Sequence, residues 1–346
     1  MNSPRVAVVI LNFNGKDFLE KFLPNIQINS TGNKIYVADN GSTDDSINFL
    51  KTNFKDVSVI AINENCGYAM GYNKALKKID SDYYILLNSD VEVTANWIEP
   101  VIELMENDKK IAACQPKLLD FKNRNLFEYA GASGGFIDNY GYPFCRGRLF
   151  NSLEKDTNQY NNATEVFWAT GACLFVKAKA FWEVGGLDDD YFAHMEEIDL
   201  CWRLKNVGYT IYVEPKSIVY HVGGGTLNKL SSQKTYLNFR NNLITLTKNH
   251  SSSFLFFKLL YRFILDGIAG IKFLIDAQPK HFFAVIRAHF AYYYRLPKTL
   301  SKRKNLKQLP NFKFNRKLTY KGNIVFDYFL NKKKKFSDLD KGFLSE

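Results

Sequence analysis

The chain has 346 residues, of which 46% are apolar, and it carries a formal net charge of +11. A chain of this length and composition can bury a sizeable hydrophobic core, which excludes an intrinsically disordered protein. Its five cysteines are odd in number and include no Cys-x-x-Cys pair, so they indicate neither a disulfide framework nor a structural zinc site and fit a reducing cytosol.

The positive charge is concentrated near the C-terminus. Residues 278–346 contain 17 Lys and Arg against 4 Asp and Glu, a net of +13, whereas residues 1–277 contain 29 against 31, a net of −2. A localised basic block predicts an anionic partner, which is either nucleic acid or an anionic membrane surface. Because the first 277 residues are close to neutral, we expect no nucleic-acid partner.

In chain order, the first 90 residues alternate β-branched apolar runs with segments of helical period. Strands are predicted at Val6–Leu11, Lys34–Ala38, Val57–Ile62 and Tyr83–Leu87, and helices at Lys16–Ile26, Ser46–Phe54 and Gly71–Ile79. The first apolar run is too short for the core of a signal peptide, so we interpret it as a strand. This order predicts an α/β fold with a doubly wound, mostly parallel sheet flanked by helices, whose site lies at the carboxyl ends of the strands.

Beyond residue 90 the pattern is less regular. A helix is predicted at Asn96–Asn107, strands at Ile111–Gln115, Val166–Val176 and Thr210–Val213, and helices at Ala178–Glu183 and Ile198–Asn206, with a loop-rich segment over 118–162. Past about residue 230 the sequence becomes helical, aromatic and basic. We therefore expect a catalytic domain over residues 1–230 and a helical extension over residues 231–346.

Polar motifs follow three of the predicted strands. Asp39 ends the second strand, where a carboxylate can accept a hydrogen bond from a nucleobase or a ribose, although the acids that follow are also explained as a helix N-cap. Gly67 follows the third strand and allows close approach of an anionic ligand to a helix N-terminus. The trio Asn88-Ser89-Asp90 is either a strand-ending turn or a metal or phosphate site. The absence of a G-x-G-x-x-G or G-x-x-x-x-G-K-[ST] motif argues against a dinucleotide dehydrogenase and a P-loop ATPase.

Together these motifs resemble a known family. The segments VVILNFNG, VADNGSTD, NENCGYAMGYNKA and LLNSDVEV are similar to the nucleotide-sugar domain of glycosyltransferase family 2, including bacterial rhamnosyltransferase-like members. The resemblance continues through WATGAC, GGLD and HMEEIDLCWR and covers residues 4 to 245. It implies a GT-A type fold and an enzyme that moves a sugar from a nucleoside-diphosphate sugar to an acceptor hydroxyl.

The resemblance also implies a set of donor-binding residues. The nucleotide-sugar would be bound by residues at the strand ends and the glycine-containing turn: Leu11, Phe13, Asp39, Asn40, Asn65, Gly67, Asn73, Asn88 and Asp90. Asp90 is the last acid of a D-x-D-like motif whose first acid is replaced here by Asn88, and it would hold a divalent cation, Mn²⁺ or Mg²⁺. His221 precedes a glycine-rich turn and is either structural or a second metal ligand facing the diphosphate.

An acid cluster opens a predicted helix further along the chain. By resemblance its second acid, Glu197, is the catalytic base that accepts the proton of the acceptor hydroxyl, with Glu196 and Asp199 beside it. The family carries Asp at the position of Glu197, so the carboxylate here is one methylene further from the backbone. Alternatively, the three acids stabilise the first turn of the helix.

The resemblance implies inverting transfer of a hexosyl or rhamnosyl group from a UDP- or dTDP-sugar to a saccharide or lipid-linked acceptor, in surface polysaccharide or glycolipid assembly. Two other functions remain open. A sugar-phosphate nucleotidyltransferase would need a glycine-rich basic loop after the first strand, which Asn14-Gly15-Lys16 hardly supplies. A catalytically silent membrane-bound scaffold would not need Asp39, Asp90 and the acid cluster.

Two C-terminal segments have amphipathic helical patterns. Residues 254–276 contain no uncharged run longer than five residues, so they do not span a membrane, and their charges share about a third of the helix circumference. Residues 280–295 repeat this pattern and lead into further lysines. Either both helices pack on the catalytic domain, or they hold the enzyme on an anionic membrane. The second reading predicts a peripheral protein on the cytoplasmic face of the cell membrane.

Overall fold

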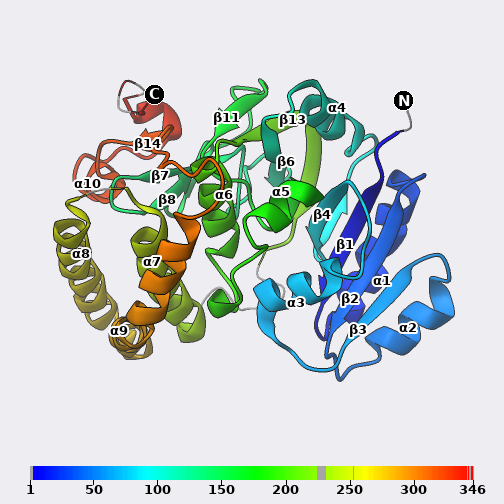
Figure 1. The fold of residues 1–346 in the computed structure, drawn as a ribbon, viewed down its shortest axis with the longest axis horizontal. Helices are drawn as coiled ribbons and strands as arrows, with labels where there is room; N and C mark the ends of the chain where they lie inside the picture. Colours follow the sequence, from blue (N-terminus) through cyan, green and yellow to red (C-terminus); the bar gives the residue numbers. More distant parts are fainter. Residues whose placement is uncertain (1–2, 224–230, 252, 341, 343, 346) are drawn as a thin grey trace.

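The computed structural model describes residues 3–223, 231–251, 253–340, 342 and 344–345. A nine-stranded sheet forms its centre (Figure 1). One half consists of parallel strands in the order β3-β2-β1-β4: β1 (Val6–Asn12), β2 (Lys34–Asn40), β3 (Ser58–Ile62) and β4 (Tyr83–Asn88). The register pairs Asn12 with Asp39 and Leu11 with Asn88, so the polar ends of three strands meet at one edge of the sheet.

The other half of the sheet mixes strand directions. It contains β5 (Val91–Val93), β6 (Ile111–Asp120), β11 (Thr164–Val166), β12 (Cys173–Lys177) and β13 (Thr210–His221). Strand β12 runs antiparallel between β4 and β6, and β13 runs parallel to β6. Strand β5 pairs with the end of β13, with His221 opposite Val91, which brings His221 beside the Asn88–Asp90 turn.

Helices cover both faces of the sheet. Alternate residues of β1 enter different hydrophobic clusters, Val8 on one face and Val9 on the other, as the two-residue period of a strand requires. The Val8 face is covered by α1 (Lys16–Asn29), α2 (Ser46–Asn53) and α4 (Glu99–Asn107). The Val9 face is covered by α3 (Gly67–Leu76), α5 (Ala178–Glu183) and α6 (Glu196–Asn206).

The segment predicted to be loop-rich contains a second sheet. Its strands are β7 (Gly135–Asp138), β8 (Pro143–Cys145), β9 (Arg148–Leu149) and β10 (Ser152–Leu153), joined by β14 (Thr319–Tyr320) from the chain end. These strands have two to four residues and are too short for alternation to be read from the sequence. The predicted strand Val166–Val176 is also interrupted, because residues 167–172 form a loop between β11 and β12.

The C-terminal region packs on the catalytic part. It contains α7 (Ser232–Asn249), α8 (Leu255–Ile275), α9 (Pro279–Leu306), α10 (Ile324–Phe329) and a short 3₁₀ helix, η2 (Phe336–Asp338). Helix α7 packs against α6 and α9, and its Leu243 joins the hydrophobic cluster of the sheet. The domain boundary near residue 230 stays a prediction, since both sides of it share this core. None of the helices in the described part of the chain has the length and apolarity needed to cross a membrane.

Candidate active site

The first wall of the site lies at the ends of β1 and β2. Asp39 is buried, and its two carboxylate oxygens accept hydrogen bonds from Asn12 Nδ2 and from the backbone N–H of Ser42, both at 3.0 Å. The buried Asn12 Oδ1 has no hydrogen-bond partner within the described ranges. Asn12, which was not among the predicted site residues, therefore offers an acceptor beside a rigidly held carboxylate.

Three predicted donor-binding residues form the turn that opens α3. The Asn40 side-chain amide donates to Asn65 Oδ1 and to the Gly67 carbonyl, both at 3.1 Å, and Asn65 Oδ1 also accepts from the Gly67 N–H at 3.0 Å. Gly67 has φ +84°, and a Cβ at this position would lie 2.6 Å from the Phe192 carbonyl oxygen. The two asparagines thus shape the loop, and glycine is required by both conformation and space.

The remaining predicted donor-binding residues of this part of the site lie at the end of β1 and on α3. Leu11 and Phe13 are half-buried at the end of β1. A Cβ on Gly71 of α3 would lie 2.9 Å from Leu11 Cδ1, so the helix approaches the strand closely. Asn73 binds the backbone of Leu187 through both side-chain atoms, at 2.7 and 3.0 Å, which ties α3 to the Gly-Gly-Leu-Asp loop.

The predicted metal residues lie together at the end of β13. His221 Nε2 is 3.1 Å from Asp90 Oδ1 and 3.5 Å from Asn88 Nδ2. On the other side of the ring, His221 Nδ1 is 3.2 Å from Oε1 of the buried Glu128. Burial disfavours the imidazolium, but the Glu128 and Asp90 carboxylates outweigh it and raise the pKa of His221 to about 10. Gly224, Gly225 and Thr226 of the same motif lie outside the described residues.

This donor set fits a divalent cation that is completed by its substrate. Asp90 Oδ1 and His221 Nε2 lie 3.1 Å apart, and a cation bound by both would displace the proton that the imidazole holds at this pKa. Glu128 supports the far ring nitrogen as outer carboxylates do for metal-bound histidines. Mg²⁺ is commonly held by one or two protein carboxylates together with substrate phosphates. Residues 3–223 and the other described ranges contain no group of three or more His, Cys, Asp or Glu side chains arranged for a metal.

The acid cluster lies in the first turn of α6. Glu196 is buried and Glu197 is half-buried, and Oε2 of each lacks a hydrogen-bond partner among the residues that the structure describes. Burial raises the pKa of Glu197 to about 7, against the neighbouring backbone amides that favour the carboxylate. Burial and the charge of Glu197 hold the pKa of Glu196 well above its usual range. Near neutral pH, Glu196 therefore carries a proton and Glu197 can exchange one.

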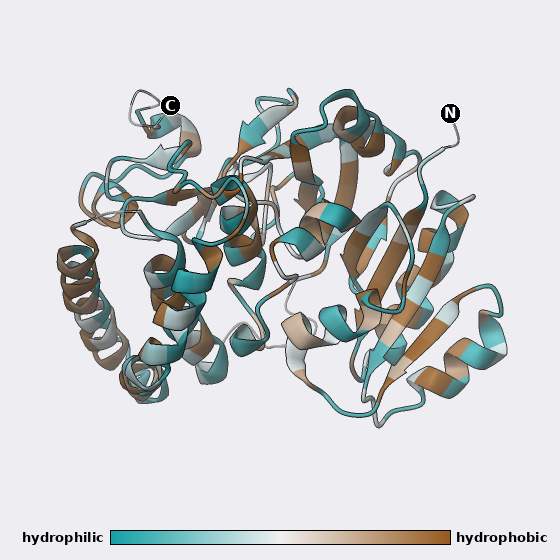
Figure 2. Cartoon of the chain, viewed as in Figure 1, coloured by the Kyte–Doolittle hydropathy of each residue, from teal (hydrophilic) through white to brown (hydrophobic). Residues whose placement is uncertain are grey.

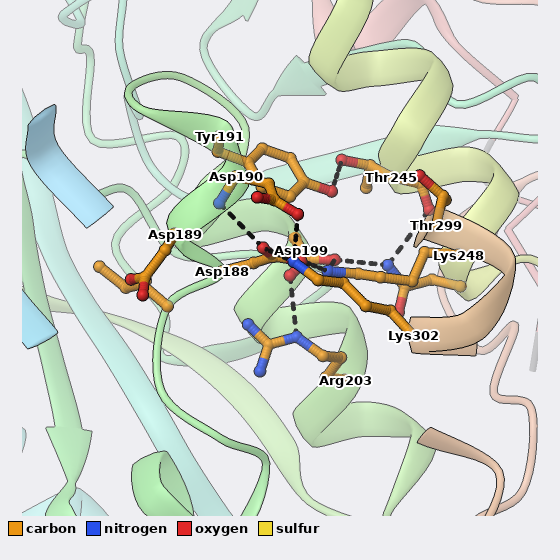
Figure 3. A network of polar contacts seen from close by, with 12 residues as sticks. Asp188, Asp189, Asp190, Tyr191, Asp199, Arg203, Thr245, Lys248, Thr299 and Lys302 are labelled. Atoms are coloured by element: carbon orange, nitrogen blue, oxygen red, sulfur yellow. Dashed lines mark hydrogen bonds and ion pairs between the residues drawn. The ribbon is translucent and has the colours of Figure 1, made fainter. Parts of the chain in front are cut away.

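Asp199 has different surroundings from the two glutamates. It forms ion pairs with Arg203, at 2.8 Å, and with Lys248 of α7, at 2.8 Å, and it accepts from the Asn249 amide at 2.7 Å (Figure 3). Burial alone would raise the pKa of Asp199, but the two cations lower it below its usual range. Asp199 is thus a permanent anion within a structural network.

The loop between β11 and β12 joins the metal side to the acid side. The Asn88 N–H donates to the Ala172 carbonyl at 3.0 Å, and Tyr68 of α3 donates its hydroxyl to the Gly171 carbonyl at 2.6 Å. A Cβ on Gly171 would lie 3.7 Å from Glu197 Cβ, so this glycine stands directly before the base candidate. One loop therefore contacts the Asn88–Asp90 turn, the start of α3 and the first turn of α6.

Comparison with known families decides the class of the protein. Residues 7–185, just over half of the chain, match the model of glycosyl transferase family 2. The chain belongs to glycosyltransferase family 2. The matched range ends before Glu196, Glu197, Asp199 and His221, so the roles of these residues stay predictions.

Two curated relatives are rhamnosyltransferases. An N-acetylglucosaminyl-diphospho-decaprenol L-rhamnosyltransferase of Mycobacterium tuberculosis is 24% identical over 239 residues, which cover 64% of this chain and 77% of the relative. Rhamnosyltransferase WbbL of Escherichia coli is 25% identical over 224 residues, covering 62% of this chain and 83% of the relative. The predicted glycosyltransferase activity is confirmed at the level of the family.

Solved structures confirm the predicted GT-A type architecture. GalNAc-T7 with UDP, GalNAc and Mn²⁺ superposes with a TM-score of 0.57 at 16% identity, covering 71% of this chain and 48% of that one. TarS residues 1–349 from Staphylococcus aureus superposes with a TM-score of 0.52 at 11% identity, covering 88% and 90%. This chain thus spans about half of the GalNAc-T7 structure and nearly all of the TarS one.

Proposed function

We propose that this glycosyltransferase transfers a hexosyl or rhamnosyl group from a UDP- or dTDP-sugar to an acceptor hydroxyl, with inversion and with a bound Mn²⁺ or Mg²⁺. The observation that carries the proposal is the convergence of three chemistries on one edge of the sheet. These are the Asp39–Asn12 pair, the Asp90–His221 pair and the half-buried Glu197. The first pair would bind the nucleotide, the second would hold the cation at the diphosphate, and Glu197 would accept the proton of the acceptor hydroxyl.

The nucleotide would lie against the ends of β1 and β2. A pyrimidine base presents an imide N–H, and the unpartnered Asn12 Oδ1 and the fixed Asp39 carboxylate are acceptors for such a donor. Leu11 and Phe13 would contact the base, and Gly71 lets α3 approach this pocket closely. The rhamnosyltransferase names of the two relatives support a deoxyhexose donor.

The diphosphate would lie between the Asn88–Asp90 turn and His221. Asp90 and His221 would hold the cation, and when bound it would neutralise the charge that develops on the leaving phosphate. Glu128 keeps the His221 ring oriented so that Nε2 faces Asp90. The expected approach of an anionic group to the N-terminus of α3 is not available, because the N–H groups of Gly67 and Tyr68 already donate to Asn65 Oδ1 and to the Phe192 carbonyl.

Proton transfer would be the task of Glu197. With a pKa near 7, it is ionised in part at neutral pH and can accept the proton of the acceptor hydroxyl as the oxygen attacks the anomeric carbon. The protonated Glu196 beside it prevents a second negative charge from accumulating in the same enclosure. A single displacement from the face opposite the leaving group inverts the configuration.

We further propose that the acceptor is lipid-linked and that the enzyme works at an anionic membrane on its cytoplasmic side. The name of the mycobacterial relative includes a diphospho-decaprenol acceptor, which supports this substrate class. The basic C-terminal part, with its net charge of +13 over residues 278–346, favours an anionic surface.

Helix α8 supports the same proposal by its orientation. Its charged stripe faces the protein: Arg262 is buried, donates to the Tyr140 carbonyl at 2.6 Å and lies 3.8 Å from the centre of the Tyr142 ring, and Asp266 lies 3.2 Å from His289 of α9. The opposite side is apolar and exposed, with Phe256, Phe257, Leu260, Ile264, Ile268, Ile271, Leu274 and Ile275. This outward face, together with Phe283, Ile286 and Phe290 of α9, is called the apolar face below.

Such an arrangement reverses that of an ordinary surface helix, which buries its apolar side. A lipid bilayer is the occupant that fits it, because Lys272, Lys280 and Arg287 are exposed beside the apolar face and can contact anionic headgroups. The contacts of α8 on its polar side hold the face outward without the help of a partner.

Release of free nucleoside diphosphate tests the function. The full chain is incubated with UDP-, dTDP- and GDP-sugars, with Mn²⁺, with Mg²⁺ or with chelator, and we expect metal-dependent release from one pyrimidine donor class. Asp90→Asn should abolish it through the loss of several kcal/mol of leaving-group stabilisation, whereas Glu92→Gln, two residues away and paired with Arg124, should not. Pyrophosphate release from a nucleoside triphosphate and a sugar 1-phosphate, supplied in a parallel reaction, would instead indicate a nucleotidyltransferase. No turnover of any of these substrates would indicate a catalytically silent scaffold.

A further inference from the structure

The segment that leads into the catalytic helix has an unusual backbone. Between the 3₁₀ helix η1 (Asp189–Tyr191) and α6, three non-glycine residues have left-handed φ angles: Phe192 (+65°), His194 (+69°) and Met195 (+74°). Side chains disfavour this region, so such residues persist only where their surroundings hold them. Residues 192–195, called the entry loop below, directly precede Glu196 and Glu197, and their conformation sets where the two carboxyls lie.

One side chain of α7 holds this entry loop. The amide of Asn241, which is fully buried, donates to the carbonyls of Tyr191 at 3.1 Å, Ala193 at 2.9 Å and His194 at 2.7 Å. Arg240 donates from Nε to Asn241 Oδ1 at 2.8 Å, which fixes the amide so that its NH₂ group faces the loop. Its Nη2 donates in addition to the Tyr191 carbonyl at 2.9 Å.

The same helix also holds both flanks of the entry loop. Lys248 bridges Asp188, before the loop, at 2.5 Å and Asp199, after it, at 2.8 Å, and Thr245 shares a hydrogen bond with the Tyr191 hydroxyl at 2.8 Å (Figure 3). Lys302 of α9 adds a second cation to Asp188 and Asp190. Every one of these groups lies beyond residue 185, where the match to the family model ends.

We propose that Asn241 is a positioning residue for glycosyl transfer: its amide keeps the entry loop in its left-handed conformation and thereby aims Glu197 at the acceptor hydroxyl. The inference rests on the proposed role of Glu197 as the base. The loop also meets the donor side, because the Tyr68 N–H at the start of α3 donates to the Phe192 carbonyl at 2.6 Å. Asn241 touches neither donor-binding residues nor the metal pair, so its loss should act on the chemical step more than on donor binding.

The test compares substitutions on one helix. Asn241→Ala removes the NH₂ group that contacts the three carbonyls, and Asn241→Ser keeps one short donor in case the alanine variant folds poorly. Thr247→Val is the matched control, because Thr247 is equally buried on α7 but pairs with Tyr292 of α9, at 2.8 Å, and not with the loop. Turnover and donor KM are measured for each full-length variant, together with amide hydrogen exchange over residues 190–200.

We expect the Asn241 variants to lose turnover by a factor on the order of 10², as misplaced reacting groups do, while donor KM changes by less than about threefold. Their amides over residues 190–200 should exchange faster than those of the wild type and of Thr247→Val. Unchanged exchange in the Asn241 variants, or an equal loss of turnover in Thr247→Val, would overturn the proposal. Hydrogen exchange does not depend on turnover. If the wild-type chain had no transferase activity, the proposed function would be refuted, but the effect of Asn241 on the exchange of the entry loop could still be measured.

Discussion

Glu196 and Glu197 are adjacent in the first turn of α6, yet replacing each carboxyl by an amide should have different effects. Glu197→Gln removes the group that accepts the proton and should lower transfer by roughly 10²–10⁴ while donor affinity stays unchanged. Glu196 already carries a proton at neutral pH, because burial and Glu197 raise its pKa, so Glu196→Gln imitates its existing state and should retain most activity. Turnover and donor dissociation constants of the two variants, measured side by side, check this difference.

If Glu196→Gln were inactive and Glu197→Gln active, the assignment of Glu197 as the base would be wrong. Asp199→Asn is a less direct comparison, since it would leave Lys248 and Arg203 buried with fewer anionic partners. Loss of activity in that variant must therefore be read together with its thermal unfolding midpoint.

The pH dependence of transfer follows from the same burial. Glu197 acts in its ionised form, and burial raises its pKa to about 7 from the 4.5 of an ordinary glutamic acid. Activity should therefore be full above about pH 8 and fall about tenfold per unit below pH 7. Single-turnover rates between pH 5.5 and 9 with saturating donor check this. A profile that stays flat down to pH 5 would contradict the assignment of Glu197 as the base.

At the residue scale, the sequence predicts the acids that lie inside motifs and misses the groups that support them. Asp39, Asp90 and Glu197 each follow a strand or begin a helix, where local patterns indicate function. Glu128 lies in a segment without a clear pattern and reaches His221 only because β6 and β13 are neighbours in the sheet. Asn12 could have been suspected from a polar side chain at the end of an apolar strand.

Among the elements, strands β1 and β4 of the parallel half are predictable because both of their faces are buried, which gives continuous apolar runs. The short strands of the second sheet give no such run. Helix α3 begins at Gly67, four residues before the predicted start, because its first turn is fixed by Asn40 and Asn65 and not by apolar periodicity. Long-range side-chain contacts therefore set what local patterns leave open.

Two glycines in different helices test how closely α3 must approach the donor pocket. Alanine normally stabilises a helix by about 1 kcal/mol relative to glycine. A Cβ on Gly71 would lie 2.9 Å from Leu11 Cδ1 and 3.2 Å from the Asn40 amide, so Gly71→Ala should weaken donor binding about tenfold, or about 1.4 kcal/mol. Gly267 of α8 has no atom within 4 Å of its Cβ position, so Gly267→Ala should raise stability and leave donor binding unchanged.

Calorimetric donor titration and thermal unfolding of both variants check this pair. Equal donor affinity in Gly71→Ala and the wild type would show that Leu11 and Asn40 move aside at little cost, and that the pocket does not depend on the close contact.

On the scale of the whole molecule, the exposed apolar surface and the catalytic sheet lie at different ends. Figure 1 shows α8 and α9 at one edge and the parallel strands β1 to β3 toward the other, with α6 and α7 between them. In Figure 2, α8 is hydrophobic over most of its length although it lies at the outer edge. Helices α6 and α7 therefore lie between the apolar face and the strand ends of the candidate site.

Sequence periodicity shows that the charges of residues 254–276 share one side, but it does not show which way that side faces. The structure turns its middle inward, because the buried Arg262 and Asp266 contact the half-buried Tyr142 and His289. Packing on the protein and exposure of an apolar side are thus not exclusive alternatives, as they seemed from the sequence.

Flotation with liposomes tests whether this apolar face binds membranes. The full chain should float with vesicles of phosphatidylcholine and anionic phosphatidylglycerol, and salt should weaken binding because each basic residue near the surface contributes about 1 kcal/mol. Ile264 and Ile271 of α8 are each 56% exposed, and each would contribute up to about 1.5–3 kcal/mol on leaving water. Ile264→Asp combined with Ile271→Asp should therefore lower vesicle binding by more than tenfold and leave activity on a soluble acceptor intact.

The matched control is Ile28→Asp, since Ile28 is 75% exposed on α1, far from α8 along the chain and in the fold. Equal flotation of the double variant and the wild type would exclude the apolar face as the binding surface. The alternative is that a second copy of the chain covers the apolar face, and sedimentation of the wild-type chain without lipid tests it. A wild-type dimer that is lost in the double variant would show that this alternative is correct. A monomer that binds anionic vesicles through α8, in contrast, would bring a soluble catalytic site to an acceptor that stays in the membrane.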